Sequence, residues 1–418
     1  MIYLDNNATT RPAPEVVQAM LRVLQEDYAN PSSVHRPGQQ ARKLIDDARA
    51  QVASLIGCSP GELTFTSGGT ESINAALAGL YRMRQPRTRV LISRVEHSAT
   101  MGACEQLKLS GADITEIEVG NDGLLDMDHL KRELTGDVAL VSMLWANNET
   151  GVIFDIPAVA ALCKASRVPF HCDGTQAVGK IPVNVRAAGV DAMSFAGHKF
   201  HGPKGVGGLY IRRGQRFSTL IAGGPQETGR RGGTENVPGI VGMGVAADLA
   251  AQALKKSAQI ASLRDELEKQ ILQTIPTAHV NGSPEHRLPN TTNIGFEQLE
   301  SEAILLLLSE RGICASAGAA CSSGSLEASH VLRAMRLDPR IAHGAIRFSL
   351  SRYTTRDEIR QALTILPEVI NKLRTVLPVG QFDDLRSATC DERHRSGQWQ
   401  TRRPDRPRPG RPRRRTPR

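Results

Sequence analysis

The sequence predicts an α/β protein in which a large, mostly parallel sheet is followed by a smaller α+β region. Between residues 15 and 250, short apolar runs alternate with stretches of helical periodicity, the pattern expected of strands joined by helices. The chain has 418 residues, enough for one large core and a second, smaller one. We predict three parts: a large α/β domain at 15–257, a small α+β domain at 1–14 with 258–380, and a disordered basic tail at 381–418.

Short apolar runs in the first region are the predicted strands of the large sheet. Runs of this kind, separated by helical stretches, are typical of strands that pair in parallel. We therefore expect them to form one layer with helices packed on it. The predicted strands lie at 63–66, 90–93, 114–119, 138–144, 168–171, 192–195 and 208–211.

Helices are predicted where apolar residues recur every three or four positions. In the segment from Gln39 to Ile56 they do so throughout, so one face of this helix should pack on the sheet. A long helical stretch is predicted at 238–271. We expect the small domain to close over the carboxyl edge of the large sheet. Its predicted strands lie at 292–296 and 345–350, and its predicted helices at 301–310 and 355–373.

The composition excludes several classes of protein. Hydrophobic residues make up 40% and charged residues 23% of the chain, and no apolar run approaches the roughly 20 residues that span a bilayer. The N-terminus has no basic segment followed by an apolar core, so we expect a cytoplasmic protein without a membrane partner. Seven cysteines without C-x-x-C spacing argue against a disulfide framework and a zinc site, so no metal is predicted to be required.

Most of the net charge of +9 lies at the C-terminus. Thr401–Arg418 holds nine Arg and one Asp, a net +8, which leaves about +1 for the other 400 residues. With five prolines and no aliphatic residue, this segment cannot bury enough apolar surface to fold. It either binds nucleic acid or acidic proteins nonspecifically or is a solubilising extension. Apart from this tail, no nucleic-acid partner is expected.

Lys199 and Asp173 are the first candidates for catalysis. Lys199 follows an apolar run, and the nearby cations His198 and Lys204 would lower the pKa of its amine. Asp173 comes 26 residues earlier, just after a predicted strand. Pyridoxal phosphate requires a lysine for its aldehyde and a carboxylate for its ring nitrogen. Either residue alone would be an ordinary loop lysine or helix cap, but the pair predicts this cofactor.

Three further strand ends carry polar groups that the same cofactor needs. The segment 66–74 opens a helix after a strand, so its first amides and the Thr70 hydroxyl would face an anion. His97 follows the next strand, where an imidazole can stack on a flat ring, and Asn148 follows another, where an amide can bond a phenolic oxygen. Each alone has an ordinary alternative as a connection, a cap or a turn. Because the carboxyl ends of parallel strands meet at one edge, together they favour one ligand site.

In these and further motifs the chain resembles the cysteine desulfurases, class-V aminotransferases within the fold-type I pyridoxal-phosphate enzymes. The likeness runs from Tyr3 to about Leu373, nearly everything except the tail. The motif at 230–236 is most similar to the NifS branch, which is associated with nitrogen fixation. The motifs are Tyr3-Leu-Asp-Asn-Asn-Ala-Thr-Thr, Asn30-Pro-Ser-Ser-Val-His, Ser67-Gly-Gly-Thr-Glu, Glu96-His, Asn147-Asn-Glu-Thr-Gly, Asp173-Gly-Thr-Gln, Gly197-His-Lys-Phe-His-Gly-Pro-Lys-Gly and Arg230-Arg-Gly-Gly-Thr-Glu-Asn.

The resemblance implies roles for the matched residues around the cofactor ring. Lys199 would bind the aldehyde, Asp173 would pair with the ring nitrogen, and His97 would stack on the ring. Asn148 and Gln176 would bond the phenolic oxygen.

The resemblance also implies a phosphate site. It would be formed by Gly69, Thr70 and the segment Ala196-Gly197-His198, with Thr234 reaching in from a second subunit, so a homodimer with shared active sites is expected. This chain departs from the family at Ala196, where a serine is common three residues before the lysine. The missing hydroxyl removes one charge-assisted hydrogen bond, worth ~1.5–3 kcal/mol, so somewhat weaker cofactor binding is expected.

Cys321 is the predicted nucleophile. It lies in a run of Gly, Ala and Ser with no bulky apolar residue before Leu326 to bury it, as a mobile, exposed thiol requires. Most cysteines are buried and inert, and Cys314, which follows an apolar helix, is predicted to be structural. Arg347 is predicted to form a two-pronged pair with the substrate carboxylate, in preference to Arg352. The resemblance adds Asn30 as a substrate contact.

The predicted reaction removes sulfur from L-cysteine, giving L-alanine and a persulfide on Cys321. The sulfur would pass to a scaffold protein for iron–sulfur cluster assembly, in connection with nitrogenase, and Cys321 could be a transient cluster ligand. Two alternatives stay open. A selenocysteine lyase or another β-eliminating enzyme would share the cofactor site, whereas a non-catalytic sulfur carrier or nucleic-acid-binding protein would use the basic tail.

Overall fold

The computed structural model describes residues 1–317 and 328–376. Residues 1–373 form one compact unit by their contacts. The predicted nucleophile Cys321 and the predicted tail at 381–418 lie outside the described residues. The predicted boundary between a large and a small domain falls at Ser257, where a helix begins.

A seven-stranded sheet forms the centre of this unit, in the order β2-β8-β7-β6-β5-β3-β4. The pairs from β7 to β4 are parallel, and β8 is antiparallel to both of its neighbours. The predicted large, mostly parallel sheet is therefore confirmed. Its strands are β2 (Leu63–Thr66), β3 (Arg89–Ser93), β4 (Asp113–Ile117), β5 (Val138–Leu144), β6 (Phe170–Asp173), β7 (Ala192–Ala196) and β8 (Gly207–Ile211).

Helices cover both faces of this sheet, so every residue of its inner strands β5, β6 and β7 is buried. In β3, Val90 and Ile92 belong to one apolar cluster and Leu91 to another, as the alternation of side chains along a strand requires. The first cluster is completed by α3 (Gly69–Arg82) and α4 (Ser98–Leu109). The second is completed by α1 (Pro14–Glu26), α2 (Arg36–Ile56), α5 (Met127–Glu133), α6 (Ile156–Ala165), α7 (Val185–Ala188) and α8 (Val237–Leu254).

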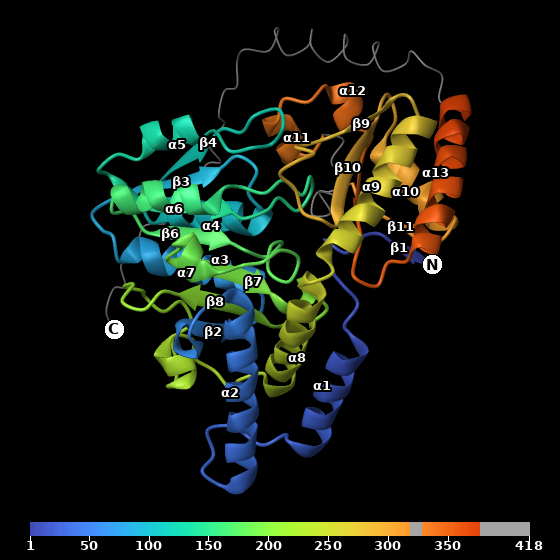
Figure 1. The fold of residues 1–418 in the computed structure, drawn as a ribbon. Helices are drawn as coiled ribbons and strands as arrows, with labels where there is room; N and C mark the ends of the chain where they lie inside the picture. The colour runs from blue at the N-terminus through green and yellow to red at the C-terminus, as the bar shows by residue number, and fades with distance from the viewer. Residues whose placement is uncertain (318–327, 377–418) are drawn as a thin grey trace, which may run out of the picture. The chain divides into compact units, whose positions relative to one another are not determined.

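A second, antiparallel sheet has the order β12-β10-β9 and carries the predicted strands of the smaller region. Figure 1 shows α9 beside β9 and β10, with α10 and α13 farther along the same region. The N-terminal strand β1 (Ile2–Tyr3) pairs in parallel with β11 (Ile313–Cys314), so the first residues of the chain belong to this region. The other elements are α9 (Ser257–Thr274), β9 (Ala278–Val280), β10 (Thr291–Phe296), α10 (Ser301–Glu310), α11 (His330–Ala334), α12 (Pro339–Ala342), β12 (Ala345–Ser349) and α13 (Arg356–Val376).

Two predicted elements differ most from the structure, while other bounds, such as those of the strand predicted at 114–119 and observed at 113–117, shift by up to three residues. The strand predicted at 168–171 is observed two residues later, as β6. The single helix predicted at 238–271 is two helices, α8 and α9, separated at Lys255 and Lys256. The short 3-10 turns at Pro60–Glu62, Gly197–Lys199 and Gln226–Gly229 were also not predicted.

Among the described residues, α8 is the one helix that is long and apolar enough to cross a membrane by length and composition alone. Half of it is buried, and Figure 1 shows it alongside α1 and α2, which it contacts. Its alanines at 246, 247 and 250 are fully buried. This is the burial of a core helix.

Candidate active site

A cavity of about 500 Å³ lies at the carboxyl ends of the parallel strands. This volume is within the ~300–1,000 Å³ of pockets that bind small molecules. Residues that follow β2, β3, β5, β6 and β7 line it, and so do Asn7 and Ala8 from the N-terminal segment. His330 and Arg347 line it from the smaller region. The structure therefore brings the predicted strand-end residues to one site.

Lys199 reaches this cavity from the turn Gly197–Lys199 that directly follows β7. Its Nζ donates hydrogen bonds to the backbone carbonyls of Asn7 and Ala8, each at 2.8 Å. The N-terminal segment thus holds the amine inside the cavity that a cofactor aldehyde would have to enter.

Asp173 and His97 lie in the same cavity, as predicted. Asp173 ends β6 and is 5% exposed, and its Oδ1 accepts a hydrogen bond from the Thr175 amide at 2.9 Å. His97 is the N-cap of α4, and its Nδ1 accepts from the Ala99 amide at 3.1 Å, so a neutral ring carries its proton on Nε2. Burial lowers the pKa of His97; the Asp173 carboxylate opposes this, whereas Lys199 adds to it. The ring is therefore available as a neutral donor.

Glu96, the residue before His97, is a buried carboxyl group. Its Oε1 accepts hydrogen bonds from Ser93 Oγ at 2.6 Å and from the Leu144 amide at 2.9 Å. Burial raises the pKa of Glu96 to about 8, although these donors lower it, and Asp173 raises it further. The side chain is therefore mainly protonated at neutral pH.

The predicted phosphate end is formed where α3 begins. Gly68 precedes the helix and supplies no side-chain cap, so the first amides of α3 are left for another acceptor. Gly69, Thr70, Ala196 and His198 line this end of the cavity. Burial and the neighbouring lysines 199 and 204 lower the pKa of His198 to about 4, so the imidazole is neutral. Its Nδ1 lies 3.1 Å from Thr9 Oγ1.

Gln176 reaches the cavity but its amide is already engaged. Its Nε2 donates to the Asn7 carbonyl at 3.0 Å, and its Oε1 accepts from Lys180 Nζ. Lys180 Nζ also donates to Asn7 Oδ1 at 2.8 Å. Burial, together with the charges of Lys199 and Arg347, lowers the pKa of Lys180 well below its ordinary value. The lysine, the glutamine and Asn7 thus form one connected group behind Lys199.

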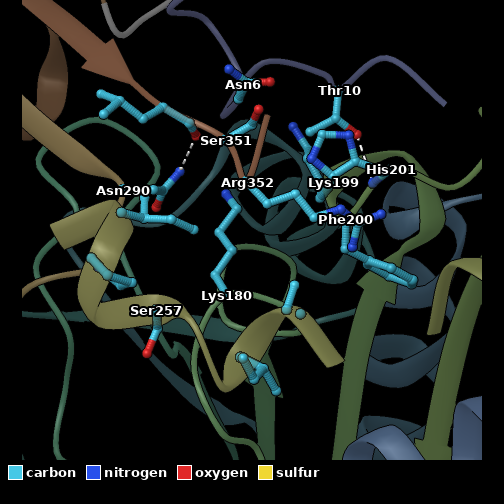
Figure 2. A pocket seen from close by; sticks show the side chains of 16 residues that line it. Asn6, Thr10, Lys180, Lys199, Phe200, His201, Ser257, Asn290, Ser351 and Arg352 are labelled. Carbon is cyan, nitrogen blue, oxygen red and sulfur yellow. Dashed lines mark hydrogen bonds between the residues drawn. The ribbon is translucent and has the colours of Figure 1, made fainter. Parts of the chain in front are cut away.

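A second cavity of about 40 Å³ touches the same lysines from another set of residues. Figure 2 shows Lys180 and Lys199 together with Asn6, Thr10 and Arg352 around it. The His201 amide donates to Thr10 Oγ1 at 2.7 Å, and Asn290 Nδ2 donates to the Leu350 carbonyl at 3.1 Å. This space is too small for a pyridoxal ring, so the larger cavity is the candidate active site.

Arg347 lies in β12 and is 2% exposed. Its Nη1 donates to the Asn148 carbonyl at 2.8 Å, and its Nη2 donates to Asp5 Oδ1 at 2.6 Å. The predicted carboxylate-binding arginine therefore has an internal carboxylate beside it. A substrate carboxylate would have to join or displace Asp5.

Three predicted residues among those that the structure describes do not line the cavity, namely Gly197, which is buried in the turn before Lys199, Asn30 and Thr234. Asn30 is exposed, and its Oδ1 accepts from the Ser32 amide at 2.9 Å within its own turn. Thr234 is exposed and does not line the cavity. Their predicted roles, like that of Cys321, stay predictions.

Several residues of the site were missed in the sequence. His330 lines the cavity, and its Nε2 lies 2.9 Å from the Glu96 carbonyl. Glu149 is buried, which raises its pKa, and its Oε2 accepts from Ser329 Oγ at 2.6 Å. No sequence spacing indicates these contacts, because they join segments about 180 or more residues apart. Thr175, in contrast, lies between two predicted residues, Asp173 and Gln176, and could have been considered.

Comparison with known proteins agrees with this geometry. The class-V aminotransferase family model matches residues 2–362. The chain is 50% identical over 378 residues to cysteine desulfurase 2 of Trichormus variabilis, which covers 90% of this chain and 95% of that protein. It is 48% identical over 379 residues to the cysteine desulfurase NifS of Azotobacter vinelandii, covering 90% and 94% respectively. This chain belongs to the cysteine desulfurases of the class-V aminotransferase family.

Solved structures show the same relationship. A NifS-like protein superposes with a TM-score of 0.84 at 37% identity, covering 89% of this chain and 100% of that one. A NifS-like protein from Rickettsia africae has a TM-score of 0.80 at 33% identity, covering 89% and 99%. The predicted fold-type I architecture is thus confirmed, and the chain is a pyridoxal-phosphate-dependent enzyme like its family.

The residues around the cavity fit this cofactor. A lysine amine and a buried carboxylate lie in one cavity, and the uncapped start of α3 offers free amides to a phosphate. Thr175 Oγ1 is buried and has no hydrogen-bond partner among the described residues. A buried hydroxyl without a partner is rare in folded proteins and indicates that a further polar group belongs beside it.

Proposed function

We propose that this chain is a cysteine desulfurase that takes sulfur from L-cysteine, releases L-alanine and carries the sulfur as a persulfide on Cys321. The observation that carries the proposal is the joint presence of Lys199, Asp173 and Arg347 around one cavity. An amino acid whose carboxylate pairs with Arg347 would have its α-carbon near the lysine amine. The relatives at 48–50% identity are named cysteine desulfurases, which supports this substrate.

The proposed residue roles follow from these positions. When bound, pyridoxal phosphate supplies an aldehyde for the substrate amine and an electron sink for the α-carbon. Asp173 would hold a proton on the ring nitrogen. The neutral His97 ring would lie against the pyridine and transfer the protons of the reacting thiols. Asn148 and Gln176 would bond the phenolic oxygen, the latter after rearranging its contacts with Asn7 and Lys180.

The sulfur step is proposed to involve Lys199 and Cys321. Lys199 takes the α-proton of the substrate and returns a proton on the way to alanine. The Cys321 thiolate attacks the substrate sulfur, the bond from Cβ to sulfur breaks, and its electron pair stays on the carbon fragment. That fragment is protonated at Cβ and becomes alanine, while Cys321 keeps the sulfur as a persulfide. The step needs no outside oxidant because the carbon fragment keeps the electron pair of the broken bond and is reduced, while the sulfur is oxidised to the persulfide level.

The sulfur acceptor is proposed to be a scaffold protein for iron–sulfur cluster assembly. Relatives include a protein named NifS from Azotobacter vinelandii, which supports a link to nitrogenase maturation. We place the enzyme in the cytoplasm. The basic tail would have an accessory role, and Cys321 could bind a nascent cluster transiently.

The active form is proposed to be a homodimer in which Thr234 completes the phosphate site of the partner subunit. Thr234 is exposed and lies outside the cavity of its own chain, which supports this role. Asn30, also exposed, is kept as a proposed substrate contact.

Replacement of the proposed nucleophile tests the reaction. We expect Cys321→Ala to keep the cofactor spectrum but to lose alanine formation from L-cysteine, because the thiol that accepts sulfur is gone. Cys314→Ala is the matched control, since Cys314 is a free, half-buried cysteine of β11, and this variant should keep its activity.

Two outcomes would contradict the proposal. If Cys321→Ala forms alanine and free sulfide as fast as the unchanged enzyme, the protein is a β-eliminating lyase instead. If the unchanged enzyme acts on selenocysteine but forms no alanine from L-cysteine, the protein is a selenocysteine lyase instead.

A further inference from the structure

Thr175 carries a hydroxyl that has no assigned partner in the cysteine desulfurase site described above. Its Oγ1 is buried and has no hydrogen-bond partner among the described residues. Four other hydroxyls in those residues share this property, and they belong to Thr64, Tyr81, Thr100 and Tyr210. Of these five side chains, Thr175 is the one that lines the large cavity. A buried hydroxyl without a hydrogen-bond partner costs free energy in the folded protein. A ligand atom that accepts a hydrogen bond from it would offset this cost.

The position of Thr175 identifies which part of the ligand it faces. A Cβ placed on Gly69, the first residue of α3, would lie 3.3 Å from Thr175 Oγ1 and 3.5 Å from Ala196 Cβ. The hydroxyl and the alanine methyl group therefore flank the same point at the uncapped start of this helix. That start is where backbone amides offer their hydrogens to an anion.

Ala196 offers no hydrogen bond at this point. It is 1% exposed, and a methyl group there donates nothing to an anion. Thr175 comes from the loop after β6, the strand paired with β7, so its side chain approaches the same place from the neighbouring strand.

We infer that the Thr175 hydroxyl donates a hydrogen bond to the cofactor phosphate and replaces the hydroxyl that Ala196 lacks. This inference rests on the proposed function only through the cofactor, and not on the fate of the substrate sulfur. Thr175 is a cofactor-binding residue in this assignment. It revises the sequence-based expectation that cofactor affinity is lower because of Ala196.

Side-chain substitutions at Thr175 allow a specific test of the proposed hydrogen bond. The Thr175 amide, which donates to Asp173 Oδ1, is unchanged by any side-chain substitution. Valine has the shape of threonine without its hydroxyl, and serine keeps the hydroxyl. The pair Thr175→Val and Thr175→Ser therefore separates the hydrogen bond from the packing.

The experiment measures cofactor binding to the full-length enzyme by absorbance, with no substrate present. We expect Thr175→Val to bind pyridoxal phosphate about 10- to 100-fold more weakly, the range for loss of a hydrogen bond to a charged group. Thr175→Ser should stay within a few-fold of the unchanged enzyme. Release of the cofactor from the holoenzyme, followed by the same absorbance, should be faster for the valine variant alone.

Pyridoxal without its phosphate identifies the contact. If Thr175 bonds the phosphate, Thr175→Val should bind pyridoxal as well as the unchanged enzyme does. Equal losses for pyridoxal and pyridoxal phosphate would instead place the contact on the ring or on Lys199 and would overturn the inference.

A rescue variant and a control complete the test. Adding Ala196→Ser to Thr175→Val should recover most of the lost affinity, because a hydroxyl is returned from the neighbouring strand. Thr64→Val is the control: its hydroxyl is also buried and unpartnered, but it lies in β2 and does not line the cavity. The inference fails if Thr175→Val binds pyridoxal phosphate within twofold of the unchanged enzyme, or if Thr64→Val weakens binding as much.

Discussion

Burial controls the protonation of individual side chains around the cofactor cavity. Glu96 and Glu149 are both nearly inaccessible to solvent, and their pKa values are raised, while His171 and His198 are held neutral. The mainly protonated Glu96 thus adds little negative charge next to Asp173.

The raised pKa of Glu96 can be tested through the pH dependence of the protein's stability. Its pKa is about 8 in the folded protein and 4.5 without the fold, so folding favours the protonated form. The stability that it contributes is full below pH 4.5 and is lost as the pH rises through about 8, with a slope of ~1.4 kcal/mol per pH unit in between. Glu96→Gln cannot ionise, so we expect its stability to fall less between pH 5 and 8.

Denaturant unfolding of both proteins across this pH range measures the difference. Glu118→Gln, at a partly exposed ion pair with Arg94, is the control and should not flatten the curve. Parallel pH profiles for Glu96→Gln and the unchanged enzyme would show that Glu96 does not titrate in this way.

At the scale of elements, close helix packing depends on residues without side chains. Gly244 of α8 faces α2, and a Cβ there would lie 2.7 Å from the Ala48 Cα and 2.4 Å from Gln51 Oε1. The backbone of α2 cannot move away as a flexible side chain can. Figure 1 shows the two helices lying along one another.

We therefore expect Gly244→Ala to destabilise the fold by about 1–3 kcal/mol, the usual cost of overpacking a tight contact. Gly102 of α4 is the matched control, because it is helical and exposed and a Cβ there would meet nothing within 4 Å. Gly102→Ala should stabilise by about 0.4–1 kcal/mol, since alanine restricts the unfolded chain. Thermal and denaturant unfolding measure both, and a neutral Gly244→Ala would show that the helices can separate without cost.

The same scale explains what could be predicted from the sequence. Strands such as 138–144 and helices such as 301–310 were predicted with their observed bounds, because their apolar pattern is strong and local. The strand at 168–171 was placed early because Val168 is apolar, yet the observed strand begins at Phe170, after Pro169. The break between α8 and α9 is invisible to periodicity, since helical residues continue across it.

Within the site, the predicted residues are those that follow strands or match motifs. Lys199, Asp173, His97 and Arg347 all line one cavity. The contacts that were missed depend on packing between distant segments: Asp5 pairs with Arg347 across 342 positions, and Lys180 bonds Asn7 across 173. No local pattern records such distances, so only the three-dimensional structure shows them.

At the scale of the whole molecule, α1 carries an apolar face that no other described element covers. Val17, Leu21 and Leu24 are 52%, 51% and 60% exposed, and their spacing places them on one side of the helix. Tyr28 and Val34 beyond the helix are also exposed. Apolar surface grouped in this way is typical of an interface, and a second copy of the chain is the occupant that the proposed contribution of Thr234 requires.

Mixed dimers test whether Thr234 acts in the partner's site. Lys199→Ala removes the cofactor lysine from one subunit, and Thr234→Val weakens the phosphate site by about tenfold or more. In a heterodimer of these two variants, the subunit with an intact Lys199 would receive Thr234 from the Lys199→Ala subunit. One complete site in two is therefore expected, with about half the cofactor bound at the affinity of the unchanged enzyme.

If Thr234 instead served its own chain, the same heterodimer would contain no complete site, and its affinity would equal that of the Thr234→Val homodimer. Heterodimers purified through two different affinity tags and titrated with pyridoxal phosphate distinguish these results.

Leu21→Lys, within the apolar face of α1, should lower the yield of dimer by placing a charge in the interface, because an unpaired buried charge is costly. Lys131→Ala, on the exposed side of α5, is the control and should leave dimer formation unchanged, and a monomeric unchanged enzyme that binds cofactor fully would overturn the shared-site proposal.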